Sequence, residues 1–128
     1  MSSGGMGLEV EFHNLGNDYY KLGDFKNAID HYSKAIARNP HMIEAYFNRG
    51  LAYSRIRDFE RALEDHDRVI ALNPAQAEAY YTRGLIKEYL RDFEAAYHDY
   101  LNALRHNPEN HEVRMQLEIV SRKRGVGR

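Results

Sequence analysis

A single repeat period runs through the chain from about Glu9 onward. The three prolines, each preceded by asparagine, stand 34 residues apart at Pro40, Pro74 and Pro108. The same period aligns further identical residues, namely Gly16, Gly50 and Gly84; Asp24, Asp58 and Asp92; Phe25, Phe59 and Phe93; and Ala28, Ala62 and Ala96. Such a period is typical of arrays in which one small unit stacks on the next. The sequence therefore predicts three stacked units.

Within each unit the apolar residues follow helical spacing, as Ala28, Tyr32 and Ala35 do. The repeated aspartate is placed to cap a helix by accepting a backbone N–H bond, and the repeated Asn-Pro pair ends one. Each unit is thus expected to hold two helices. A seventh, amphipathic helix is predicted from His111 to about Lys123, where it would cap the last unit.

A glycine inside a helix lowers the stability of the helix by about 1 kcal/mol relative to alanine. Its recurrence at the equivalent positions Gly16, Gly50 and Gly84 therefore calls for a structural explanation. Close contact between the two helices of a unit supplies one. We expect these glycines and the repeated alanines to be structural, with no role in binding.

The composition excludes several classes of protein. With 43% hydrophobic and 29% charged residues, the chain is too apolar for whole-chain disorder. It has no cysteine, and so no disulfide, thiolate nucleophile or cysteine-based metal site. No apolar run approaches the length of a membrane span. We expect a cytoplasmic protein that does not enter a membrane.

The last residues are basic, with Arg122, Lys123, Arg124 and Arg128 and no acid among them. The rest of the chain has more acidic than basic residues, which disfavours binding of the negatively charged nucleic-acid backbone outside these last residues. The basic run could contact nucleic acid, an acidic membrane or a nuclear-import receptor. The favoured alternative is a helix end stabilised by its dipole.

No catalytic or metal-binding arrangement stands out. The candidate metal ligands His31, His66 and His98 fall in three different units, and His106 and His111 merely flank Pro108. The serines lack a base and an orienting group nearby. We expect no enzyme activity, no metal and no cofactor.

The landmarks of the first unit, taken together, resemble the tetratricopeptide repeat. They are Phe12, Leu15, Gly16, Tyr19, Ala28, Tyr32, Ala35 and Pro40. The resemblance implies an all-α, right-handed α-solenoid with repeats at residues 9–42, 43–76 and 77–110 and a capping helix at 111–124. Residues 1–8 and 125–128 are expected to be flexible.

Family resemblance also implies a concave face, lined by the first helix of each repeat, that binds a peptide or helix of another protein. The candidate groove residues are Asn17, Tyr20, Phe47, Asn48, Leu51, Tyr81, Leu85 and Tyr89. The alternative for some of the apolar members is packing between adjacent units. A self-assembling scaffold, joined through the ends of the stack, is a further alternative.

One subfamily binds the acidic C-terminal tails of Hsp70 and Hsp90 through a clamp of two asparagines and several cations. The resemblance places the asparagines at Asn17 and Asn48, but the cationic positions read His13, Glu78 and Thr82. We therefore expect weak binding of such tails.

Two arginines depart from the family pattern. Arg49 and Arg83 stand at the repeat position that holds the apolar Leu15 in the first unit. In the same two units, Asp65 and Asp99 stand at the repeat position of His31. Because charge appears at both positions together, we predict an Arg49–Asp65 and an Arg83–Asp99 ion pair.

Overall fold

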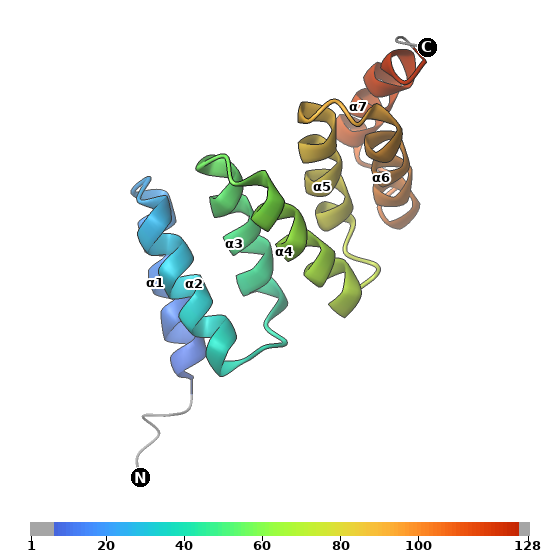
Figure 1. Cartoon of the computed structure of the whole chain (residues 1–128). Coiled ribbons are helices and arrows are strands. Elements are labelled where there is room, and N and C mark those ends of the chain that lie inside the picture. The colour runs from blue at the N-terminus through green and yellow to red at the C-terminus, as the bar shows by residue number, and fades with distance from the viewer. Residues whose placement is uncertain (1–6, 126–128) are drawn as a thin grey trace. The chain divides into compact units, whose positions relative to one another are not determined.

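The computed structural model describes residues 7–125, and within them it contains seven α-helices and no strand (Figure 1). The helices are α1 Leu8–Lys21, α2 Phe25–Arg38, α3 Ile43–Arg55, α4 Phe59–Leu72, α5 Ala77–Tyr89, α6 Phe93–His106 and α7 His111–Lys123. The prediction of three helix pairs and a seventh helix is confirmed. The expectation of flexibility at residues 1–6 and 126–128 lies outside the described residues.

The chain divides into two compact units, residues 1–68 and 69–128, with the boundary inside α4. In unit 1, α2 packs along α1 and α3 packs along α2. In unit 2, α6 packs along α5 and α7 packs along α6. Within each unit, helices that follow one another in the sequence lie side by side and run in opposite directions (Figure 1).

The predicted helix caps are present. The carboxylate of Asp24 accepts the backbone N–H of Asn27 at 3.3 Å, and that of Asp92 accepts the N–H of Ala95 at 3.2 Å. The third aspartate of the column, Asp58, caps α4 in the same way, 3.3 Å from the N–H of the third residue after it. These bonds satisfy backbone donors that a helix start leaves without partners.

The residue before each capping aspartate has a positive φ. It is Gly23 at 80° in the first repeat, but Arg57 at 66° and Arg91 at 68° in the other two. Left-handed backbone costs a residue with a Cβ roughly 1–2 kcal/mol, a cost that glycine avoids. Arginine is therefore the less stable choice at these two turns.

The repeated glycines lie where the two helices of a repeat touch. A Cβ atom on Gly16 would lie 2.5 Å from the ring of Tyr32, and one on Gly84 would lie 2.6 Å from the ring of Tyr100. Both rings are almost completely buried. The predicted reason for glycine, close helix contact, is confirmed.

Helix α7 completes the core of unit 2. Its Val113 and Val120 are buried together with Tyr100, and Leu117 packs against the same cluster. The expected capping role of this helix is confirmed.

Both predicted ion pairs are present. The guanidinium of Arg49 makes two hydrogen bonds to Asp65, with an N–O distance of 2.7 Å for the shorter, and Arg83 approaches Asp99 to the same distance. The Asp65 side chain is only 5% exposed. Burial raises the pKa of its carboxyl above the ordinary value although Arg49 acts in the opposite direction. The pair is therefore costly to break from one side only.

Arg49→Leu should lower the free energy of unfolding by about 3 kcal/mol, because it leaves Asp65 buried without its cation. The double variant Arg49→Leu with Asp65→His copies the first repeat, where His31 contacts Tyr19 at 5.0 Å between ring centroids and bonds the backbone of α2. It should recover at least half of that loss in urea unfolding. Equal losses in the single and double variants would contradict the charge argument.

Candidate functional site

Three helices of unit 1 bring a cluster of polar side chains together. The side-chain amide of Asn48, on α3, donates through Nδ2 to His13 Nε2 at 2.9 Å and lies 3.4 Å from Asn17 Oδ1, both on α1. From α2, the hydroxyl of Tyr32 donates to Asn17 Oδ1 at 2.6 Å. The two predicted asparagines are thus side by side, and a core tyrosine orients one of them.

A cavity of about 140 Å³ opens beside this pair, and we call it the amide pocket. Its lining residues are Asn17, Tyr20, Lys21, Tyr32, Asn48 and Leu51. Among residues 7–125, none accepts a hydrogen bond from Asn17 Nδ2 and none donates to Asn48 Oδ1. The pocket therefore combines apolar walls with one donor and one acceptor that can bind a ligand.

Burial shifts two pKa values in this cluster. It lowers the pKa of His13, against the opposing effect of Glu44, so that neutral His13 can accept the Asn48 proton. Burial also raises the pKa of Tyr32 to about 12, and the tyrosine keeps the proton that it donates to Asn17. Near neutral pH the cluster thus holds no cation at the His13 position.

Phe47 is the fifth predicted groove residue of unit 1, and it lies outside the lining of the amide pocket. Its ring is half-buried and meets the ring of His66, on α4, edge-on at 5.5 Å between centroids. Part of this side chain therefore serves packing within its own repeat.

In unit 2 the predicted groove residues are divided between packing and exposure. Tyr81 packs against the core, 5.8 Å from the ring of Tyr100. By contrast, Leu85 and Tyr89 are 37% and 54% exposed. They line an open depression of about 380 Å³, together with Glu88, Arg91, Phe93, Gln116 and Lys123.

Sequence reasoning missed several of these lining residues. Lys21 and Tyr32 had no predicted binding role, although Lys21 follows Asn17 by one helical turn and this spacing could have indicated it. Arg91, Phe93 and Gln116 gave no such signal. Lys123 is exposed, and its Nζ lies 3.3 Å from Glu88.

The basic run at the end of α7 is paired with carboxylates. Arg122 bonds Glu118 at 3.0 Å, and Arg124 bonds Glu94 at 2.6 Å. The guanidinium of Arg124 also lies 3.6 Å from the centroid of the Tyr97 ring. These contacts support the interpretation of this run as a helix end rather than as a surface for nucleic acid.

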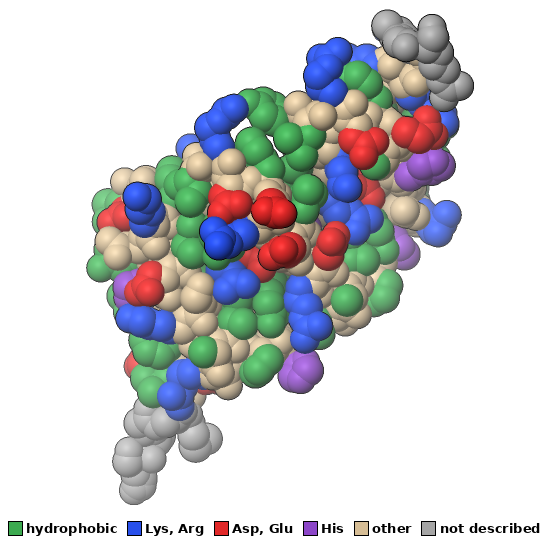
Figure 2. Space-filling view, in the orientation of Figure 1, with side chains coloured by type: hydrophobic (Ala, Val, Ile, Leu, Met, Phe, Trp, Pro, Cys, Tyr) green, Lys and Arg blue, Asp and Glu red, His purple; other side chains and the backbone are tan. Residues whose placement is uncertain are grey.

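Charges of both signs cover the visible surface, and acidic side chains gather over α4 (Figure 2). Exposed acids on that helix include Glu60, Glu64 and Asp67. No group of three or more potential metal ligands occurs within residues 7–125. Nor is any helix of that range long and apolar enough to cross a membrane.

Paired helices, glycine contacts and a pocket on the first helices define a helical-repeat, protein-binding domain. The sequence profile of the tetratricopeptide repeat family matches residues 50–119, and a second profile, described as TPR repeat, matches residues 16–56. The chain belongs to the tetratricopeptide repeat family.

Similar structures include domains that were solved with chaperone peptides. The first TPR of Spaghetti (RPAP3), bound to the HSP90 peptide SRMEEVD, is 32% identical with a TM-score of 0.86, over 90% of this chain and 91% of that one. The second TPR domain of human RPAP3, in complex with the HSP70 peptide SGPTIEEVD, is 25% identical with a TM-score of 0.83, over 89% and 95%.

A curated relative is similar over a shorter stretch. Stress-induced-phosphoprotein 1 of Caenorhabditis elegans is 43% identical over 42 residues, which are 33% of this chain. The match spans 13% of the length of that relative.

Tyr32→Phe should lower the free energy of unfolding by about 1 kcal/mol at pH 7, because it removes the bond to Asn17. Since the pKa is about 12 in the folded chain and 10.0 in the reference state, this tyrosine stabilises the fold fully below pH 10. That contribution is lost as the pH rises toward 12, and the variant should lack this loss. Urea unfolding between pH 7 and 11 measures both effects, with Tyr89→Phe as the exposed control. Unchanged stability of Tyr32→Phe at pH 7 would contradict the assigned bond.

Proposed function

We propose that this domain is a non-catalytic module that binds a peptide segment of another protein on the first helices of its repeats, α1, α3 and α5. The observation that carries this proposal is the amide pocket, where Asn17 and Asn48 present a donor and an acceptor beside apolar side chains.

An extended peptide offers one backbone donor and one acceptor per residue, and both need partners when water is excluded. Asn17 Nδ2 suits a carbonyl of such a peptide, and Asn48 Oδ1 suits an N–H. These contacts do not depend on the side chains of the ligand, so they hold its backbone without choosing its sequence. Neighbouring apolar groups must supply the selectivity.

Leu51 is the apolar side chain of the amide pocket best placed for that task, since Tyr32 is buried in the core and Tyr20 packs partly against it. Leu85 and Tyr89 offer apolar surface in unit 2. Aromatic and aliphatic anchors in partly enclosed surfaces usually dominate the affinity of an interface, while charges at its rim mainly tune the association rate.

Selection from a library of random peptides with free carboxyl termini tests the proposal. Leu51→Ala should weaken the selected peptides by about tenfold or more, and Asn48→Ala should also weaken them. Leu22→Ala is a matched control in unit 1, because Leu22 is 78% exposed and lies outside the amide pocket. The proposal would be contradicted if the selected peptides bound the wild type and all three variants equally, or if no peptide were selected.

A second candidate ligand is the acidic tail of Hsp70 or Hsp90, since the two RPAP3 domains were solved with HSP90 and HSP70 peptides. The side-by-side asparagines favour it. The residues at the three cationic positions of the clamp argue against this ligand. The pKa of His13 is lowered, Glu78 is acidic, and the hydroxyl of Thr82 donates to backbone carbonyls of its own helix. We therefore rank it second.

Calorimetry with the peptide SRMEEVD should show weak binding at pH 7, because the terminal carboxylate finds no cation at those positions. Acidification should strengthen binding, since protonated His13 would supply a positive charge beside Asn48. A peptide with an amidated C-terminus is the control for the terminal carboxylate. Micromolar affinity that Asn17→Ala and Asn48→Ala abolish would reverse the ranking and make chaperone tails the first candidate.

A further inference from the structure

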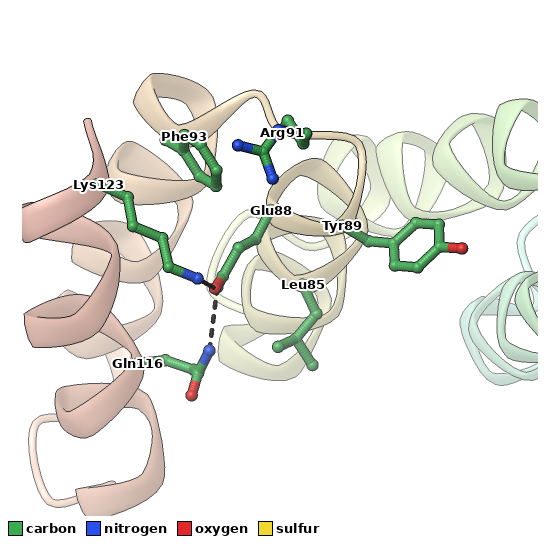
Figure 3. A pocket seen from close by; sticks show the side chains of 7 residues that line it. All are labelled: Leu85, Glu88, Tyr89, Arg91, Phe93, Gln116 and Lys123. Atoms are coloured by element: carbon green, nitrogen blue, oxygen red, sulfur yellow. Dashed lines mark hydrogen bonds and ion pairs between the residues drawn. The ribbon is translucent and has the colours of Figure 1, made fainter. Parts of the chain in front are cut away.

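The depression in unit 2, which we call the α5–α7 depression, is lined by one acidic and two basic side chains beside apolar ones. Leu85 and Tyr89 point to one side of α5, while Glu88 faces α7, where Lys123 and Gln116 reach it (Figure 3). Arg91 and Phe93 close the end at the turn between α5 and α6.

Glu88 is held entirely by neighbours and is not offered to a ligand. Its Oε1 accepts from the hydroxyl of Tyr100 at 2.8 Å and from Gln116 at 3.0 Å, and its Oε2 lies 3.3 Å from the ammonium of Lys123. The side chain is 14% exposed. The one acid among the lining residues is therefore already neutralised by its hydrogen bonds and its ion pair.

Two cations converge on one ring in the same depression. The guanidinium of Arg91 lies 5.2 Å from the centroid of Phe93, and the ammonium of Lys123 lies 5.6 Å from it. Both cations gain from the electron-rich face of the ring. Lys123 forms an ion pair with Glu88, but no carboxylate among the described residues forms an ion pair with Arg91. The site thus has an excess of positive charge beside the apolar Leu85.

We propose that the α5–α7 depression binds an internal acidic segment of a partner protein, in which a carboxylate side chain lies close to a large apolar one. The carboxylate would bind Arg91, which forms no ion pair with a described carboxylate, and the apolar side chain would pack on Leu85. Charge complementarity selects this occupant, because the lining combines a net positive charge with exposed apolar surface. The inference rests on the proposed peptide-binding function and adds a ligand chemistry and a second contact region.

The chain supplies a matched pair of test variants. Arg91→Gly removes the cation at a turn where Gly23 shows that glycine fits, so the fold should tolerate it. Arg57→Gly makes the same change at the equivalent turn of unit 1, where φ is 66° and the arginine lies over Phe59. Both variants lose a cation and gain turn stability, but only one alters the α5–α7 depression.

The test is selection from random peptides fused at both ends, so that no free carboxyl terminus is present. We expect enrichment of peptides with aspartate or glutamate within two residues of a large apolar residue. For such a peptide, Arg91→Gly should raise the dissociation constant about fivefold and Arg57→Gly should leave it unchanged. Replacing the peptide's acid by its amide should weaken wild-type binding by a similar factor but have little further effect on Arg91→Gly.

Selected peptides without an acidic preference, or equal effects of the two glycine variants, would overturn this inference and leave the proposed function intact. If the library with free carboxyl termini yields binding peptides and the library fused at both ends yields none, the inference is likewise overturned and the proposed function stands. Failure of both libraries would overturn the proposed function together with the inference.

Discussion

The contact between a glycine and an aromatic ring is the interaction on which both units depend. Because Gly16 and Gly84 lack a Cβ, the rings of Tyr32 and Tyr100 can lie against the backbone of the first helix of their repeat. The same contact brings each tyrosine hydroxyl to a polar side chain of the first helix. One bonds Asn17 in the amide pocket, and the other bonds Glu88 in the α5–α7 depression. Packing of the core thus orients Asn17 and Glu88.

Several arginines of this domain form ion pairs with carboxylates of the chain. Arg49 and Arg83 are bound to buried aspartates, in a column where the first repeat has a leucine. The basic end of α7 is likewise paired, so Arg122 and Arg124 make contacts within unit 2. Cations already bound to carboxylates contribute little to attracting an acidic ligand, because a new contact must compete with an existing one.

The distribution of the remaining charge separates this chain from the chaperone-tail binders that it resembles. The asparagine pair is in place, but Glu78 and Thr82 provide no cation on α5. Positive charge occurs instead near the far end of that helix, at Arg91 and Lys123. This arrangement is the basis for our proposal that ranks acidic chaperone tails second.

The sequence by itself determined the repeat, the helix caps, the glycine contacts and the pairing of Arg49 with Asp65. All of these follow from periodic spacing or local backbone chemistry, whereas Asn17 and Asn48 were indicated by the resemblance to the tetratricopeptide repeat family. Only the tertiary structure decided that Tyr32 orients Asn17 and that Lys123 and Gln116 converge on Glu88. Helix α7 keeps the 34-residue spacing of α3 and α5 but not their landmark residues, since Arg114 and Glu118 stand where Tyr80 and Gly84 stand in α5. Its amphipathic spacing predicted that it caps the last unit, but the contacts of its polar side chains are decided only when Val113 and Val120 are buried in the folded core.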